Sequence, residues 1–154
     1  MNTDSLKDAL QDLKTATRMS GGEAILALDT ALQAVAAHRN AASIGPILTM
    51  LNDEAEHDEG MFSLIHAAEA FDDTEYVAQL LKVLPEMQAS APKWASIVLM
   101  RVLNSGPARD VLVHALREAS PETKRATEWL CKKVNERSAS FSSKTMPVLL
   151  AARG

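Results

Sequence analysis

The sequence has few of the residues on which extracellular, β-sheet and membrane proteins depend. Its single cysteine, Cys131, excludes an internal disulfide, and nothing indicates an oxidising compartment. Aromatic residues make up only 4% of the chain and β-branched residues are uncommon, which disfavours strands. No apolar run approaches the ~20 residues of a membrane span, and the charged, amphipathic start is unlike a signal peptide. We therefore expect a cytoplasmic protein without membrane contact.

The residues that are plentiful favour helices. The chain has 154 residues, of which 47% are hydrophobic, and Ala, Leu, Met, Lys and Glu are common. A chain of this length can bury about 70% of the surface that it exposes when unfolded, so it needs neither disulfide nor metal to fold. We expect a single all-helical domain over residues 1–154.

Turn signals divide the chain into about nine helices. Ser20 and Glu23 have the spacing of a capping box at the start of the second helix, and Pro85 is expected to end the fifth. Ser105 and Ser120 stand at the starts of two later helices. The helices expected from these signals and from apolar periodicity span about 4–18, 23–37, 46–51, 56–71, 74–83, 94–103, 108–119, 121–137 and 147–152.

Short connections favour antiparallel pairing of neighbouring helices. Residues 46–52 should pair with 56–71, 73–84 with 92–104, and 107–119 with 121–137. A row of such hairpins predicts an all-α, HEAT-like right-handed solenoid, although no repeat is visible in the sequence.

The formal net charge of −4 conceals a strong segregation of charge along the chain. Residues 1–39 carry five acids and four bases, and residues 82–154 carry six acids and twelve bases. Residues 40–81 carry nine acids and neither Lys nor Arg. These acids repel one another unless a basic surface covers them, which favours a cationic protein partner.

The predicted helix 56–71 has two distinct faces. Its core face carries apolar residues at helical spacing, namely Met61, Leu64, Ile65 and Ala68. A second sector carries acids interleaved with a phenyl ring and an imidazole, namely Glu59, Phe62, His66, Glu69 and Asp73. An isolated helix of this kind would simply be solvated, but the surrounding acids favour a docking surface. The predicted partner-binding residues are Asp53, Glu54, Glu56, Asp58, Glu59, Phe62, His66, Glu69, Asp72, Asp73 and Glu75.

The pattern does not favour catalysis or metal binding. His57 and His66 are nine residues apart and fall on nearly opposite helix faces, without zinc- or calcium-site spacing. Cys131 has no base placed to activate it and reads as a small core residue. We expect no enzyme, no metal and no cofactor. Trp94 and Arg101 could anchor an interface, but we favour a buried helix whose arginine is neutralised by a neighbouring acid.

Two other partners are conceivable on charge alone. The basic C-terminal third could attract nucleic acid, yet it lacks interleaved aromatic residues and its bases alternate with acids, so we expect none to bind. It could also meet the acidic segment of a second copy, which leaves a homo-oligomer open. A small enzyme using the Glu and His cluster is a weaker hypothesis. A HEAT-like scaffold or adaptor in another cellular assembly is the main alternative to a protein that binds one cationic partner.

Three runs resemble the bacterial Immunity protein 30 family. They are EHDEGMFSLIHAAEAFDD (56–73), APKWASIVLMRVLNS (91–105) and VNERSASFSSKTMPVLLA (134–151). The resemblance covers roughly residues 40–151, which would form the family-like core behind two N-terminal helices in residues 1–39. It implies a small helical inhibitor, encoded beside a polymorphic or contact-dependent growth-inhibition toxin, that neutralises a cognate toxin domain. Many such toxins are nucleases with basic clefts, which an acidic protein can occupy in place of a phosphate backbone.

Overall fold

The computed structural model describes residues 3–154, with side chains from Ser5 onward, and these residues form α-helices and two short 3-10 turns without a strand. The α-helices are α1 (Thr3–Thr17), α2 (Ala24–Ala36), α3 (Ile44–Leu48), α4 (Asp58–Glu69), α5 (Asp73–Ser90), α6 (Pro92–Leu103), α7 (Gly106–Arg117), α8 (Pro121–Arg137) and α9 (Ser142–Arg153). The 3-10 turns are η1 (Ala41–Ser43), before α3, and η2 (Ala139–Phe141), before α9. The all-α class and the nine helices are as predicted.

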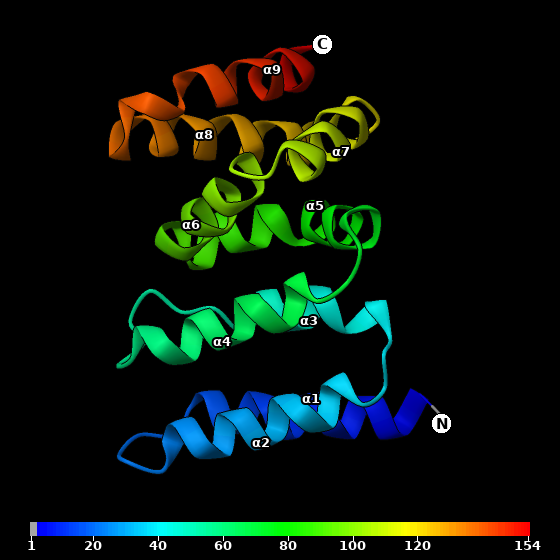
Figure 1. The fold of residues 1–154 in the computed structure, drawn as a ribbon, viewed down its shortest axis with the longest axis vertical. Helices are drawn as coiled ribbons and strands as arrows, with labels where there is room; N and C mark the ends of the chain where they lie inside the picture. The colour runs from blue at the N-terminus through cyan, green and yellow to red at the C-terminus, as the bar shows by residue number, and fades with distance from the viewer. Residues whose placement is uncertain (1–2) are drawn as a thin grey trace.

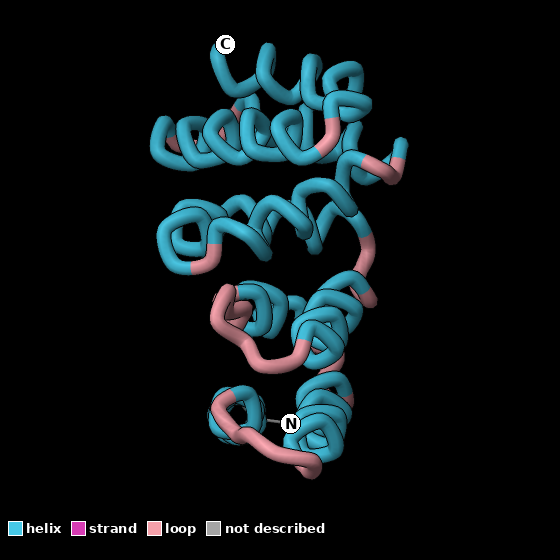
Figure 2. Tube along the Cα trace, turned by 90° about the vertical axis from the view of Figure 1, so that its left-hand side faces the viewer, coloured by secondary structure: helices cyan, strands magenta, loops and turns pink. Residues whose placement is uncertain are grey.

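The helices lie in successive layers along the long axis of the molecule, and the chain runs from one end of the stack to the other (Figure 1). α1 packs on α2, α3 on α4, and α5 on α6, while α9 covers both α7 and α8. Between layers, α2 packs on α4 and α3 on α5, and α8 lies on both α5 and α6. Figure 2 shows the lower pairs nearly end-on, each as two helices side by side.

One continuous cluster of buried apolar side chains runs through the layers from Leu6 to Ala152. Its largest member is Trp94 of α6, which is 1% exposed. The four residues predicted as the core face of α4 are all buried. The apolar periodicity therefore identified the inward faces correctly, because one side of each helix must leave water.

The prediction that Pro85 ends its helix was wrong, because α5 continues through it to Ser90. Proline has no N–H, so the carbonyl of Leu81, four residues earlier, loses its partner within the helix. The hydroxyl of Thr123 on α8 donates to that carbonyl at 3.2 Å, in a buried contact. A neighbouring helix thus satisfies the carbonyl that the proline leaves free.

Other helix starts and pairings also differ from expectation. α2 begins at Ala24 with Glu23 as its N-cap residue and no side-chain cap, so the capping box of Ser20 does not form. α9 begins at Ser142 and contains Pro147 in its interior, and α3 begins before Pro46. α8 packs mainly on α5, α6 and α9 rather than on α7, so 107–119 and 121–137 do not form the predicted hairpin.

A glycine allows the first pair of helices to dock on the second. A Cβ added at Gly60 of α4 would lie 3.1 Å from Cδ2 of Leu28 on α2. This close approach joins α2 to α4.

Within the described residues, no helix combines the length and hydropathy needed to cross a membrane.

Candidate functional site

The fold divides the acidic segment into two separate groups. The first acidic cluster consists of Glu54, Glu56, Asp58 and Glu59, around the start of α4. The second acidic cluster consists of Asp72, Asp73 and Glu75, at the start of α5. The twelve residues of α4 separate the two clusters by about 18 Å, at a rise of ~1.5 Å per residue. These acids of the predicted docking surface therefore form two patches at opposite ends of one helix.

Asp53 acts as a helix cap inside the protein. Its two carboxylate oxygens accept hydrogen bonds from the backbone N–H groups of Lys93 (3.0 Å) and Trp94 (3.1 Å), in the first turn of α6. The residue before α6, Ala91, has no side chain that could do this. Asp53 therefore stabilises the N-terminus of a helix some forty residues further along the chain, where the helix dipole favours a negative charge.

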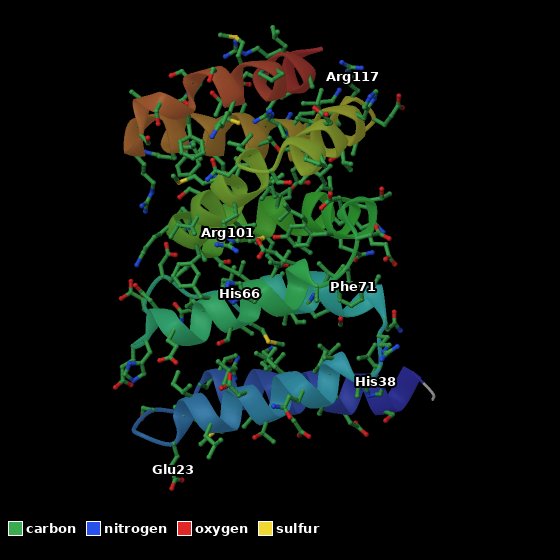
Figure 3. All side chains as sticks on the ribbon, in the orientation of Figure 1. Glu23, His38, His66, Phe71, Arg101 and Arg117 are labelled. Carbon is green, nitrogen blue, oxygen red and sulfur yellow. The ribbon has the colours of Figure 1, made fainter. Side chains whose placement is uncertain are left out.

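Glu69 is also occupied within the protein. Its carboxylate accepts two hydrogen bonds of 2.8 Å from Nε and Nη2 of Arg101 on α6, in a half-buried bidentate pair. Figure 3 shows Arg101 in the layer above His66. The prediction that an acid from a neighbour neutralises Arg101 is confirmed, and Glu69 is that acid. Such pairs fix geometry, because both hydrogen bonds require the planar guanidinium.

Phe62 faces α6 as well. Its ring lies edge-on to the buried ring of Trp94, with the centroids 5.1 Å apart and the planes at 83°. His66 is exposed, 6.5 Å from the Phe62 ring. Lys93 of α6 lies 5.2 Å from the Trp94 ring centroid and 4.0 Å from the carboxylate of Asp58. Phe62 and Glu69 of the predicted docking surface thus lie at the seam between α4 and α6.

The second acidic cluster is partly a helix cap. The side chain of Asp72 accepts a hydrogen bond of 2.8 Å from the backbone N–H of Glu75. A side-chain hydrogen bond with Asp72, and then its negative charge, raise the pKa of Glu75 above the ordinary value for a glutamate. Asp73 and Glu75 are exposed in the first turn of α5. The dipole of α5 favours negative charges at these positions, whether or not a partner binds there.

The first acidic cluster is the larger of the two. All four of its members are exposed. Among the described residues, its ion pairs are the long contact of Asp58 with Lys93 and a 3.5 Å contact between Glu56 and His57 beside it. Glu54 and Glu59 have no ion pair within that part of the chain. Four carboxylates close together with so little compensation favour a positively charged partner.

The buried titratable groups do not form a reactive site. Cys131 is fully buried, and burial, followed by the charge of Glu128, raises the pKa of its thiol to about 12. Burial, followed by the charge of Glu69, raises the pKa of Tyr76 well above its ordinary value. No group of three metal-ligating side chains converges in the part of the chain that the structure describes.

A groove next to the first acidic cluster was not anticipated. It has a volume of about 1100 Å³ and lies between α1 and α2 on one side and α3, the 51–57 loop and the end of α5 on the other. Lys7 and Lys14 line it on α1, seven residues apart and so on one helix face. That spacing could have indicated a basic stripe, but the opposing wall comes from side chains between positions 42 and 90, which periodicity does not reveal.

Comparison with known proteins identifies one family. The family model described as Immunity protein 30 matches residues 15–112, well over half of the chain. The match includes the runs at 56–73 and 91–105, begins earlier than residue 40, and ends before the run at 134–151. The comparison with curated proteins gave no match, and the comparison with solved structures gave none either.

Proposed function

The chain belongs to the Immunity protein 30 family and is therefore a non-enzymatic immunity protein of a polymorphic toxin system, and we propose that it neutralises its toxin by covering a basic surface with the residues 53–75. The first acidic cluster makes the principal contact. His66 and the second acidic cluster extend the contact along α4 and α5. The toxin is a basic catalytic domain of the contact-dependent growth-inhibition kind, and a nuclease fits best.

The observation that carries this proposal is the exposure of carboxylates that the protein itself does not pair. Glu54 and Glu59 are exposed and have no ion pair among the described residues, while Lys93 and Arg101 of α6 are already engaged with Asp58 and Glu69. Opposite charges on two proteins raise the rate at which they associate, by as much as ~10³-fold, and rapid capture is valuable against a lethal enzyme. A nuclease cleft built for phosphates offers the complementary positive field.

Asp53, Phe62 and Glu69 contribute to this surface in a different way. Their contacts with α6 hold α4, from its preceding loop to its last residue, in place. A preorganised surface loses less entropy on binding, which lowers the cost of association. We therefore assign these three residues the positioning of the contact, while the exposed acids meet the toxin.

The arrangement of the layers suits such a role. We propose that the stack is a HEAT-like right-handed solenoid that acts as one domain over residues 1–154 in the cytoplasm, where it meets toxin before or after delivery. Solenoids offer long, rigid surfaces whose residues come from successive helices. The two acidic clusters would then face one partner from two layers.

Charge reversal tests the proposal directly. We would make the triple variant Glu54→Lys/Glu56→Lys/Glu59→Lys and measure its binding to the toxin domain encoded beside this chain, together with protection of cells that express the toxin. The matched control is Asp29→Lys/Asp110→Lys/Glu118→Lys, which reverses three exposed acids on α2, α7 and the residue after α7. Both variants change the net charge equally.

We expect the first variant to lose at least ~100-fold in affinity and to stop protecting cells, since each reversed contact costs ~1 kcal/mol or more. The control should bind nearly as the wild type. Equal binding by both variants would remove the first acidic cluster from the interface, and a toxin that does not bind the wild-type chain would remove the proposed function itself.

A further inference from the structure

The groove beside the first acidic cluster has an apolar floor that the protein leaves partly uncovered. Leu10 of α1, Ile25 of α2, Met50 and Ala55 line it and are only half-buried. The groove exists because α2 packs on α4, through Gly60, while α1 makes no comparable contact with α3. The first layer (α1 and α2) therefore contacts the second layer (α3 and α4) through α2, while α1 stands apart from α3.

The two walls of the groove carry opposite charges. Lys7, Lys14 and Arg18 stand on the side of α1, and all three are exposed. Glu54, Glu56 and Glu86 stand on the opposite side, from the 51–57 loop and α5, and are exposed as well. No ion pair joins the two walls in the described part of the chain. Among the described residues, each wall thus presents exposed charge that has no partner on the opposite wall, above an apolar floor.

We propose that this groove seats an amphipathic helix of the toxin, with apolar side chains on the floor, acids toward α1 and bases toward the 51–57 loop. The inference rests on the proposed function, since it names a second contact for the same partner. The volume of about 1100 Å³ holds roughly nine residues of a helix ~10 Å wide with a rise of ~1.5 Å per residue. Helix-in-groove binding uses apolar anchors at i, i+3, i+4 and i+7, which span eight residues.

The position of the groove favours the toxin over other occupants. Glu54 and Glu56 belong to both the first acidic cluster and the groove wall, so a protein that covers the cluster lies across the mouth of the groove. A partner of one charge sign would satisfy one wall and be repelled by the other. A helix with an acidic flank and a basic flank satisfies both, and its apolar face removes the half-buried floor from water.

Site-specific photo-crosslinking tests the assignment in the complex of the full chain with the toxin domain encoded beside it. A benzophenone amino acid would replace Gln11, an exposed groove residue of α1, and in a control Asp29, an exposed residue of α2 outside the groove. A third position, Glu59, reports the first acidic cluster without lining the groove. The cross-linked toxin peptides are identified by mass spectrometry.

A charge-reversal pair gives a second readout. Lys7→Glu/Arg18→Glu reverses two exposed bases of the α1 wall, and Lys82→Glu/Arg125→Glu reverses two exposed bases outside the groove. We expect Gln11 to cross-link one toxin stretch with alternating apolar and charged residues at helical spacing, and Asp29 to cross-link none. The groove variant should raise the dissociation constant about tenfold or more, and the control should not.

The outcomes separate this inference from the proposed function. If Glu59 cross-links the toxin but Gln11 does not, and Lys7→Glu/Arg18→Glu binds normally, the groove assignment fails and the acidic contact stands. If Gln11 cross-links a second copy of this chain, the groove is a contact between copies and the assignment also fails. If wild type and toxin form no complex, the proposed function fails, and this inference fails with it.

Discussion

The hydrogen bond between Thr123 and the carbonyl of Leu81 should be coupled to Pro85. Both residues of the bond are buried, with 7% of Thr123 and 6% of Leu81 exposed. Thr123→Val keeps the shape of the side chain and removes the donor, so a buried carbonyl without an intrahelical partner loses its hydrogen bond. An unsatisfied buried acceptor costs ~1–3 kcal/mol, and the melting temperature should fall by ~2–4 °C for each kcal/mol in a chain of this size.

A double-mutant cycle isolates the reason for that cost. Pro85→Ala restores an N–H at position 85 that can donate to the carbonyl of Leu81 within α5. In that background Thr123→Val should cost less than in the wild type, because the carbonyl no longer depends on α8 and only the Ser120 hydroxyl, which donates to Thr123, loses its partner. Urea unfolding followed by circular dichroism measures all four free energies of unfolding.

A neighbouring threonine provides the control for this cycle. The hydroxyl of Thr127 is buried and donates to the carbonyl of Thr123 at 2.8 Å within α8. Thr127→Val should change stability by the same amount with Pro85 or Ala at position 85. If Thr123→Val lowers the free energy of unfolding equally with Pro or Ala at position 85, the hydrogen bond from Thr123 does not compensate for Pro85. Our explanation of why α5 continues through Pro85 would then be refuted.

Four further predictions concern Asp53, Tyr76 and Cys131. Asp53→Ala should lower the free energy of unfolding by ~1–2 kcal/mol in urea titrations, because α6 loses its cap, whereas a purely toxin-facing acid would leave it unchanged. Stability should fall as pH rises above about 9, because Tyr76 and Cys131 have raised pKa values in the folded protein and ionise first in the unfolded chain; Tyr76→Phe should reduce that fall in melts between pH 8 and 11. Tyr76→Phe should cost nothing at pH 7, since its buried hydroxyl has no hydrogen-bond partner among the described residues. The Cys131 thiol should react with a thiol reagent at pH 8 only as fast as the protein opens, and rapid stoichiometric labelling of the native protein would contradict its burial.

Much of the fold could be predicted because it depends on local periodicity. The core face of α4 follows from residues three and four apart, and the caps at Ser105, Ser120 and Asp72 follow from side chains three residues before their partners. Pro85 could not be interpreted in the same way. The donor that replaces its hydrogen bond lies 42 residues from Leu81 in the sequence, on a helix whose position no local pattern reveals.

The same distinction between local patterns and long-range contacts applies to the candidate site. The nine acids without a compensating base in residues 40–81 are a property of the sequence and remain the best pointer to a basic partner. Which of them are free is a property of the packing of α6 against α4. That packing brings Arg101 to Glu69 across 32 residues and the first turn of α6 to Asp53 across about 40. Three of the eleven predicted contact residues, Asp53, Phe62 and Glu69, thereby make contacts within the fold.

By itself, then, the sequence determined the helical class, the inward faces, the acidic segment and the family resemblance, because each of these is encoded by neighbouring residues or a contiguous run. Tertiary structure alone decided that the acids form two clusters about one helix length apart, which carboxylates are already paired, and that a groove with oppositely charged walls lies beside them. The physical reason is that pairing of charges and exposure of apolar surface depend on which distant helices come into contact, and helix packing brings together residues that no local spacing relates.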